Sequence, residues 1–382
     1  MVKIVADSAI PFAERFFSHI GELNLLHGEE INSESLTDAE VLVCRTVTTV
    51  NQQLLENSNI KIVACPTSGV DHVDLDYLFK HSIQFACAPG SNARSVAEYV
   101  VSALCVLADQ KGLDLSAKTF GIIGCGNVGS LLQKFIQTMG LECLVYDPFL
   151  QKASSDGIFC ELEDIKRADI ISLHVPLTKT GPYPTMGMLD QQFFQGMKKD
   201  AILVNTARGG VVDEAALKIY LQSNDVAMTV IDVWENEPAI DHDLLVRADI
   251  ATPHIAGYSI DSKLRATKTV YEKACAHLQL DSYIDDLDSV FPVDEDHKIS
   301  LSEYENDLEA LSMAVLASYD VRSDAAAIRR MLEDNVTDHP GYFSELRNNY
   351  PIRREFSSLN INVSKDADSL REKLLRLGFH TQ

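Results

Sequence analysis

The stretch FGIIGCGNVG at residues 120–129 decides the fold. It begins with the β-prone run FGII, and three glycines follow in the spacing GxGxxG. The residues after Gly129 keep a helical pattern to about Met139. A strand, a glycine turn and a helix in this order are typical of the start of a βαβ unit with parallel strands.

Each of the three glycines has its own physical reason. The first permits the tight turn, the second lets the backbone approach a pyrophosphate, and the third allows close packing of helix on strand. The helix N-terminus then offers free N–H groups and a partial positive charge. We therefore expect a dinucleotide phosphate site at Gly124, Gly126, Asn127, Val128 and Gly129. A structural glycine turn or an S-adenosylmethionine site is the alternative.

An acidic residue ends the next apolar run. The β-prone segment 141–147 finishes at Asp147, eighteen residues after Gly129. A carboxylate at this place accepts hydrogen bonds from the adenosine ribose hydroxyls and repels an additional phosphate. The sequence therefore predicts NAD, rather than NADP, as the cofactor.

Apolar runs alternate with helical patterns on both sides of the glycine loop. Before it, β-prone runs lie at 2–6, 41–44, 60–64 and 83–86, and helical patterns lie at 12–20, 73–80 and 95–110. After it, β-prone runs lie at 170–176, 201–207 and 228–234, with a helix at 214–222. This alternation predicts an α/β fold with two doubly wound parallel-sheet domains, the second of them a Rossmann domain.

The pattern changes after His254. A long helix is expected at 262–280, followed by a solvated acidic linker at 281–309. The remainder predicts a small α+β C-terminal domain, with helices at 303–316, 325–333 and 367–377 and a strand at 356–361.

Composition excludes several classes of partner. The 382 residues hold 33 Lys and Arg against 56 Asp and Glu, a net charge of −23. This balance argues against nucleic acid and against an anionic membrane surface. The N-terminus has no basic region followed by a long apolar stretch, so we expect no signal peptide. The longest apolar run, 99–108, is too short to span a membrane. Eight dispersed cysteines without a CxxC motif indicate free thiols in a reducing cytoplasm, with a zinc site or disulfide framework as the alternative.

Three residues that follow predicted strands suit acid–base chemistry. Arg208, Glu237 and His254 all fall where open α/β sheets place their ligands. A guanidinium binds a carboxylate through two donors, an imidazole exchanges a proton near neutral pH, and a neighbouring carboxylate orients the imidazole. Together they suit hydride transfer at a 2-hydroxy acid, although each residue alone has an ordinary structural explanation.

Four motifs carry a family resemblance. The glycine loop, MKKDAILVNTARGGVVD at 197–213, DVWENEP at 232–238 and TPHIAG at 252–257 resemble the D-isomer-specific 2-hydroxyacid dehydrogenases. The resemblance covers about residues 1–285. It implies a substrate domain formed by 1–95 and 256–285, an inserted NAD domain at 96–255 and a C-terminal dimerisation domain at 286–382.

The resemblance also implies residue roles. Arg208 would bind the substrate carboxylate, Glu237 would pair with His254, and His254 would be the proton donor in the reduction direction. The nicotinamide carboxamide would be held by Asp232. The other NAD contacts would be Val175, Thr206, Ala207 and Gly257.

Further segments resemble one branch of that family, which acts on a phosphorylated 2-hydroxy acid. They are RTVTTVN at 45–51, SGVDHVD at 68–74, GPYPT at 181–185, HIAGYS at 254–259, YDVRSD at 319–324 and RREFSSL at 353–359. Thr46, Thr67 and Tyr258 would contact the substrate. Pro66 and Val175 depart from the pattern, and neither belongs to the acid–base set.

Some alternatives stay open at this point. Arg45 follows a predicted strand and could bind a phosphate or carboxylate, or form a structural ion pair. Arg347, Arg353 and Arg354 could reach a phosphate, although an interface role is favoured. The competing functions are another 2-hydroxyacid dehydrogenase, such as one acting on phosphoglycerate, and a non-enzymatic NAD-sensing protein.

Overall fold

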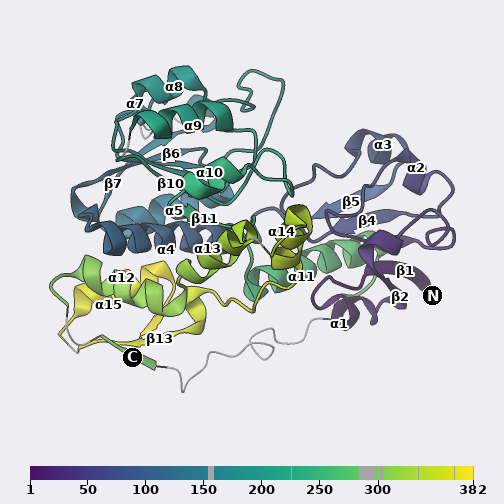
Figure 1. Cartoon of the computed structure of the whole chain (residues 1–382). Helices are drawn as coiled ribbons and strands as arrows, with labels where there is room; N and C mark the ends of the chain where they lie inside the picture. The colour runs from purple at the N-terminus through teal and green to yellow at the C-terminus, as the bar shows by residue number, and fades with distance from the viewer. Residues whose placement is uncertain are drawn as a thin grey trace. The chain divides into compact units, whose positions relative to one another are not determined.

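The chain folds into two compact units, which are described separately. The computed structural model describes residues 1–153, 159–224, 226–283, 298–301, 304–333, 335–364 and 366–381. Unit 1 comprises Met1–Asn92 and Ser259–Pro292, and unit 2 comprises Ala93–Tyr258 and Val293–Gln382 (Figure 1). The first part of unit 2 is therefore inserted into unit 1.

Unit 1 is built on a five-stranded parallel sheet with the strand order β2-β1-β3-β4-β5. The strands are β1 (Val2–Asp7), β2 (Gly21–Leu26), β3 (Val41–Val43), β4 (Ile62–Cys65) and β5 (Gln84–Cys87). One face packs on α1 (Ala13–Phe17) and α11 (Ile260–Leu278), and the other packs near α2 (Gln52–Leu55) and α3 (Leu75–Lys80). Both faces are thus buried by apolar side chains.

Unit 2 contains a six-stranded parallel sheet with the order β11-β10-β9-β8-β6-β7. Its strands are β6 (Thr119–Ile123), β7 (Glu142–Tyr146), β8 (Ile170–Leu173), β9 (Ile202–Asn205), β10 (Met228–Ile231) and β11 (Ile250–Ala251). The order reverses at β6, which lies between β7 and β8. Such a switch point is where ligands bind, outside the carboxyl ends of the strands.

Helices cover both faces of this second sheet. One face carries α4 (Ala93–Lys111) and α5 (Asn127–Thr138). The other carries α8 (Gln191–Gly196), α9 (Glu214–Ser223) and α10 (His242–Arg247), with the short α6 (Pro148–Ala153) and α7 (Leu162–Ile165) after β7 (Figure 1). The prediction of two doubly wound parallel-sheet domains is confirmed.

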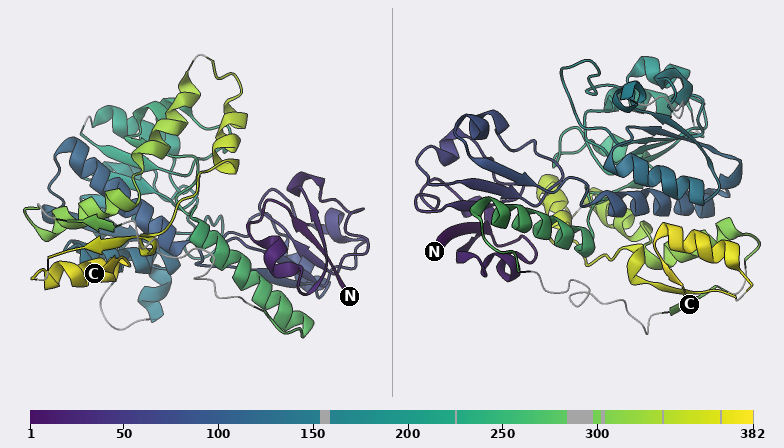
Figure 2. Two further views of the ribbon diagram at one scale, coloured as in Figure 1. Left: turned by 90° about the horizontal axis from the view of Figure 1, so that it is seen from below. Right: turned by 180° about the vertical axis from the view of Figure 1, so that it is seen from behind.

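The C-terminal segment packs against α4 and α5, as both views of Figure 2 show. It contains a small parallel sheet, β12 (Lys298–Ser300), β13 (Asn360–Asn362) and β14 (His380–Thr381), in the order β12-β13-β14. Its helices are α12 (Asp307–Ser318), α13 (Arg322–Arg329), α14 (His339–Asn348) and α15 (Asp368–Leu377). The α+β class predicted for this segment is confirmed.

Several expected elements differ in the structure. The helix expected at 12–20 ends at Phe17, and β2 follows; β2 is an edge strand whose GELNLL sequence lacks β-branched residues. The strand expected at 356–361 begins with a 3-10 turn at Phe356–Ser358, so only its end is a strand. Most of the acidic linker expected at 281–309 lies outside the described residues, although β12 and the start of α12 fall within it.

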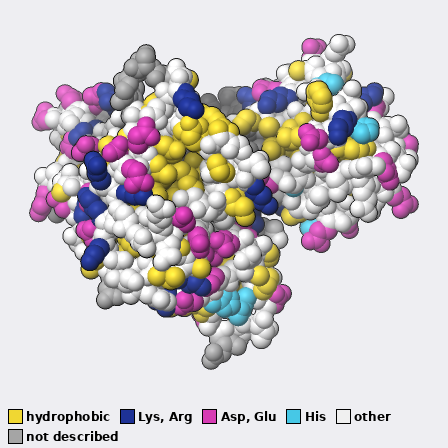
Figure 3. All heavy atoms as spheres, turned by 90° about the horizontal axis from the view of Figure 1, so that it is seen from above, with side chains coloured by type: hydrophobic (Ala, Val, Ile, Leu, Met, Phe, Trp, Pro, Cys, Tyr) yellow, Lys and Arg dark blue, Asp and Glu magenta, His cyan; other side chains and the backbone are white. Residues whose placement is uncertain are grey.

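On one face of the molecule the acidic side chains are dispersed (Figure 3). On the face drawn in Figure 3, Asp and Glu side chains form small groups interspersed with Lys and Arg. Within the described residues, no helix is long and apolar enough to cross a membrane.

A buried polar network joins the C-terminal segment to α4. Arg353 donates to the carbonyl oxygens of Ser95 (2.7 Å) and Ala256 (3.0 Å), and its guanidinium lies 3.7 Å from the centre of the Tyr319 ring. Glu98, on α4, accepts a hydrogen bond from the Phe356 N–H at 3.0 Å. Burial raises the pKa of Glu98 well above its ordinary value, with help from the neighbouring Glu355, while the charge of Arg353 opposes the shift. Arg353 thus brings positive charge to this buried cluster, together with Arg94, whose Nη1 lies 3.8 Å from Glu98 Oε1.

We predict that Arg353→Met lowers the free energy of unfolding by about 3–5 kcal/mol, because it takes a positive charge and two hydrogen bonds away from this buried cluster. Urea unfolding monitored by the single tryptophan, Trp234, would measure the change. Arg376→Met, at an exposed ion pair with Glu372, is the control and should change stability by less than about 1 kcal/mol. A wild-type midpoint in the Arg353 variant would contradict the role given to this network.

Candidate active site

The glycine loop after β6 has the geometry that its sequence predicts. Gly124 has a φ of +91°, and a Cβ there would lie 2.6 Å from the carbonyl oxygen of His174. A Cβ on Gly129 would lie 1.9 Å from the carbonyl oxygen of Gly124. At Gly126, the N-cap of α5, an added Cβ would meet no protein atom within 4 Å. Two glycines are thus required by the fold itself, and the third leaves open space at the helix N-terminus.

Asp147 lies beside this loop, immediately after β7. Its Oδ2 accepts a hydrogen bond from the Cys125 N–H at 2.9 Å, and its Oδ1 accepts from the N–H groups of Phe149 and Leu150 at 3.1 Å. A recess of about 300 Å³ is lined by the two sequence neighbours of Asp147 and by four further residues. The lining residues are Tyr146, Pro148, Gln151, Lys152, Glu161 and Tyr183. The carboxylate is therefore held at a fixed place next to a space that suits a nucleoside.

Two further residues predicted to contact the cofactor follow neighbouring strands. Val175 comes after β8, and its Cγ1 lies 2.7 Å from the place of a Cβ on Gly124. Thr206 comes after β9, and its hydroxyl oxygen is buried without a hydrogen-bond partner in the described part of the chain. A buried hydroxyl without a partner is uncommon in native structures. Together with the space at Gly126, it fits a dinucleotide whose polar groups supply the missing contact.

His254 and Glu237 come together after β11 and β10. The Nδ1 atom of His254 lies 2.7 Å from Oε2 of Glu237, and the histidine side chain is 32% exposed. Glu237 Oε1 accepts from the Trp234 N–H at 2.9 Å. Burial works to raise the pKa of Glu237, yet the hydrogen bond and charge of His254 and the Trp234 N–H lower it overall. Glu237 is thus an anion that orients the imidazole and leaves Nε2 for another ligand.

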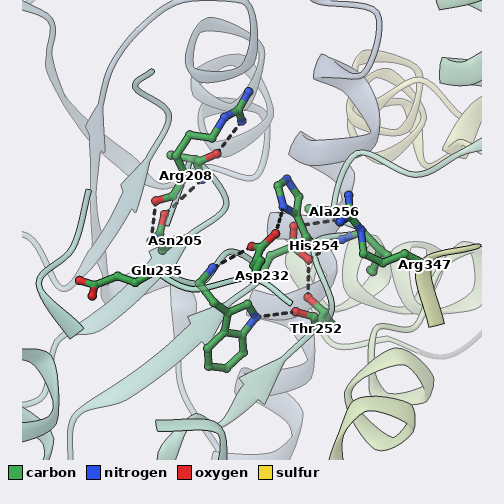
Figure 4. A network of polar contacts seen from close by, with 12 residues as sticks. Asn205, Arg208, Asp232, Glu235, Thr252, His254, Ala256 and Arg347 are labelled. Carbon is green, nitrogen blue, oxygen red and sulfur yellow. Dashed lines mark hydrogen bonds and ion pairs between the residues drawn. The ribbon is translucent and has the colours of Figure 1, made fainter. Parts of the chain in front are cut away.

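A buried carboxylate fixes the loop that carries His254. Asp232 is 1% exposed, and its oxygens accept from Thr252 Oγ1 at 2.6 Å and from the N–H groups of Ile255 (2.7 Å) and Ala256 (3.0 Å) (Figure 4). Burial raises its pKa, although His254 and these donors oppose the shift. A carboxylate has about four acceptor positions, so three bonds leave one for a carboxamide.

Arg208 follows β9 in a loop that is held close to the residues after β10. A Cβ on Gly209 would lie 1.8 Å from the carbonyl oxygen of Trp234, so these two loops touch through their backbones. The Asn205 carbonyl oxygen accepts from the Asp232 N–H at 3.0 Å. Figure 4 shows Arg208 and Asn205 on one side of Asp232 and His254. The three residues of the predicted acid–base set therefore lie on consecutive strand ends of one sheet.

The structure adds Arg347 to this neighbourhood. It lies on α14, and its Nη2 donates to the Tyr258 hydroxyl at 3.2 Å, with the guanidinium 5.9 Å from the ring centre. Tyr258 also packs edge-on against Tyr350 at 5.7 Å. Gly257 and Tyr258 lie three and four residues after His254 and are half-buried. The sequence left a phosphate contact or an interface role open for Arg347 and favoured the interface.

The other predicted substrate contacts lie in unit 1. Thr46 is exposed after β3, while Thr67 is half-buried after β4 and its hydroxyl donates to the Gly69 carbonyl at 2.8 Å. Arg45 donates from Nε to Oδ2 of the buried Asp7 at 2.6 Å, the ion pair that was one of its two alternatives.

One group of potential metal ligands occurs among the described residues. Cys44, Cys65 and His72 have donor atoms within 4.8 Å of one another, and the two buried sulfurs lie 3.4 Å apart. All eight cysteines are free thiols. The thiol–thiol hydrogen bond accounts for the close sulfurs. His72 Nε2 beside them is buried without a hydrogen-bond partner in the described part of the chain.

Comparison with known proteins identifies first the class and then the family. Residues 97–256 match the family model described as D-isomer specific 2-hydroxyacid dehydrogenase, NAD binding domain, so this part is the NAD-binding domain of a dehydrogenase. An erythronate-4-phosphate dehydrogenase of Hahella chejuensis is 41% identical over 379 residues and one of Escherichia coli O157:H7 is 40% identical over 380, each covering 98–99% of both chains. The chain belongs to the erythronate-4-phosphate dehydrogenase family, the branch that the local motifs predicted.

Solved structures agree with this assignment. A D-lactate dehydrogenase of Aquifex aeolicus, in complex with NAD and lactic acid, is 26% identical with a TM-score of 0.60 and covers 73% of this chain. A 3-phosphoglycerate dehydrogenase of Entamoeba histolytica with bound NAD shares the fold, with a TM-score of 0.62. Residues 290–378 match a family described only as a domain of unknown function.

The different surroundings of Gly126 and Gly129 give a prediction. Gly129→Ala should lower the free energy of unfolding by about 1–3 kcal/mol, since its methyl group would overlap the Gly124 carbonyl. Gly126→Ala should leave the free energy of unfolding unchanged. It should weaken NADH binding by roughly 10- to 100-fold, because its methyl group would overlap the bound cofactor instead of the protein. Urea unfolding and NADH fluorescence titration would separate the two effects. Equal NADH affinity in Gly126→Ala and wild type would contradict the phosphate site.

Proposed function

We propose that this protein oxidises 4-phospho-D-erythronate to 3-hydroxy-2-oxo-4-phosphooxybutanoate with NAD, as a step of pyridoxine and pyridoxal 5′-phosphate biosynthesis in the cytoplasm. The observation that carries the chemistry is the 2.7 Å contact between His254 Nδ1 and Glu237 Oε2 beside the NAD-binding sheet. The names of relatives about 40% identical over the full chain support the substrate.

The reaction needs a base at the hydroxyl of C2. With Nδ1 held by Glu237, the imidazole presents Nε2 to that hydroxyl and accepts its proton, while Glu237 stabilises the imidazolium that forms. NAD, when bound, accepts the hydride that leaves C2. In the reverse direction His254 returns the proton to the 2-oxo group.

Arg208 is assigned to the substrate carboxylate. A planar guanidinium makes two parallel hydrogen bonds to a carboxylate and so fixes its direction. The backbone contact at Gly209 holds the loop beside the strand that leads to Glu237. Among the residues of unit 1, Thr46 and Thr67 are assigned to the substrate. Arg45 is also assigned to the substrate, but only through those of its N–H donors that do not bind Asp7.

The preference for NAD is assigned to Asp147. Its carboxylate is fixed by backbone N–H groups at 2.9–3.1 Å, including that of Cys125 in the glycine loop. A fixed anion at the ribose position accepts from the 2′- and 3′-hydroxyls and repels a 2′-phosphate.

The test of this proposal is a panel of substrates and cofactors. NADH formation is followed with 4-phosphoerythronate, 3-phosphoglycerate, D-erythronate and D-glycerate, each with NAD and with NADP. The proposal requires the highest kcat/KM for 4-phosphoerythronate with NAD. A preference for 3-phosphoglycerate would favour the related dehydrogenase, and NAD binding without turnover of any acid would favour a non-enzymatic sensor.

His254 gives the sharpest prediction for the chemistry. His254→Gln should lower kcat by about 10²–10⁴-fold, the usual contribution of a positioned acid–base group, with NADH affinity retained. His277→Gln, on the exposed side of α11, serves as the control and should keep wild-type kcat. An unchanged kcat in the His254 variant, together with a deuterium isotope effect showing rate-limiting hydride transfer, would refute the role.

We also propose that the protein is a homodimer held by the C-terminal segment. β13 is paired on both sides, by β12 and β14, so the interface would use other surfaces than the strand at 356–361. Support comes from exposed apolar side chains in this segment, namely Met313, Leu332, Ile352 and Leu375.

The prediction for light scattering is twice the 42.3 kDa mass of one chain. Ile352→Asp should shift the protein toward the monomer, since Ile352 is 76% exposed in the single chain. Val246→Asp, at an exposed apolar residue outside the segment, is the control. A wild-type mass of one chain would exclude the dimer.

A further inference from the structure

Arg347 places a positive charge from the C-terminal segment next to the residues around His254. It occupies the last turn of α14, more than ninety residues after His254 in the sequence. Its Nη2 donates to the hydroxyl of Tyr258 at 3.2 Å. Both residues belong to unit 2, so this contact lies within one compact body.

The guanidinium has donors that the protein does not use. Its Nε is buried and has no hydrogen-bond partner in the described part of the chain. Of the five N–H donors of an arginine, the structure shows one in a hydrogen bond, to Tyr258. A buried cation with unused donors is costly unless an anion completes it.

The neighbouring carboxylates, Glu237 and Asp232, do not accept hydrogen bonds from the Arg347 guanidinium. Burial lowers the pKa of Arg347, whereas Tyr258, Glu237 and Asp232 raise it overall, so the negative groups act on it through space. Glu237 accepts from His254 and Trp234, and Asp232 accepts from the loop at 252–256. No hydrogen bond joins either carboxylate to Arg347 among the described residues. The Arg347 side chain is only half-buried, so the donors that the protein does not use are left for a ligand.

The arrangement of two arginines about His254 matches a substrate with two anionic groups. Figure 4 shows Arg208 to one side of His254 and Arg347 to the other, with the imidazole between them. In a four-carbon 2-hydroxy acid phosphate, the reacting C2 stands between a carboxylate on C1 and a phosphate on C4. An imidazole at the C2 hydroxyl would then have one arginine for each anionic end.

We propose that Arg347 binds the phosphate group of the substrate, with the Tyr258 hydroxyl beside it. This inference rests on the proposed function, because it needs a phosphorylated 2-hydroxy acid. It gives the C-terminal segment a part in substrate selection in addition to its packing on α4. A charged, multi-donor contact of this kind distinguishes the phosphorylated acid from the same acid with a free hydroxyl.

The alternative is that Arg347 acts only through its neighbours, by holding Tyr258 or by adding positive charge near Glu237. Such a positioning role would affect a phosphorylated and an unphosphorylated acid equally. It would also move the pH profile of kcat, because the Glu237–His254 pair would change. The two roles are therefore separable by kinetics.

The experiment compares Arg347→Gln, Arg347→Lys and wild type in the full-length protein. KM and kcat are measured with 4-phosphoerythronate over a range of pH, and D-erythronate is measured as a substrate or, if it is not oxidised, as a competitive inhibitor. Inorganic phosphate is titrated as a second competitive inhibitor. Arg330→Gln, at an exposed arginine of the same segment, is the matched control.

Binding to phosphate requires a selective loss. Arg347→Gln should raise KM for 4-phosphoerythronate and the inhibition constant of phosphate by about 10- to 100-fold. The constant for D-erythronate should stay within about twofold, and Arg347→Lys should recover part of the loss because it keeps the charge. NADH binding and the melting temperature report folding, and the Lys variant provides the test if the Gln variant does not fold.

Two results would overturn the inference while leaving the proposed function intact. One is an equal loss with both acids and a shifted pH profile, which shows positioning of Tyr258 or Glu237. The other is wild-type kinetics in both Arg347 variants. If instead wild type prefers the unphosphorylated acid, the proposed function itself has failed, whatever the variants show.

Discussion

The geometry of the active site depends on one buried carboxylate. Asp232 follows β10 directly, and its oxygens accept hydrogen bonds from three donors in the loop at 252–256. His254, in the middle of that loop, has a φ of +59°, a conformation that non-glycine residues rarely adopt without support. The buried hydrogen bonds of Asp232 supply that support, and the imidazole can then meet Glu237 at 2.7 Å. A chain from Tyr99 through Thr252 to Asp232 extends this support into α4.

Close backbone approach is the second constraint on the site. Gly129 lies against Gly124, and Gly209 lies against the Trp234 carbonyl, at separations that leave no room for a Cβ. The first approach places the N-terminus of α5 beside β6, and the second places the Arg208 loop beside the loop that leads to Glu237. Binding and acid–base residues from distant parts of the chain are thus aligned by contacts that only glycine permits.

Much of this could be predicted from sequence because it depends on local rules. The strand, glycine turn and helix at 120–139, the acid at Asp147 and the polar residues at strand ends all follow from spacing along the chain. β2 was missed because its sequence, GELNLL, lacks the β-branched residues that are typical of strands. For Arg347 the sequence left a phosphate contact and an interface role open, because its placement depends on packing between segments far apart in sequence, which a single sequence does not report. For Arg45 the sequence left open a substrate anion or a structural ion pair, and the structure shows the ion pair with Asp7.

The packing of the C-terminal segment places one of its residues, Arg347, next to the residues around His254. Its apolar residues extend the core formed by α4 and α5, and Arg353 ties its chain to the carbonyls of Ser95 and Ala256. Ala256 is also held by Asp232, so the same residue joins the segment to the His254 loop. Once the chain at 353 is fixed there, α14, which ends at Asn348, has few residues in which to move away. The position of Arg347 beside Tyr258 is therefore a consequence of the packing that stabilises the segment. A guanidinium fixed at that position favours a phosphorylated acid over the same acid without phosphate.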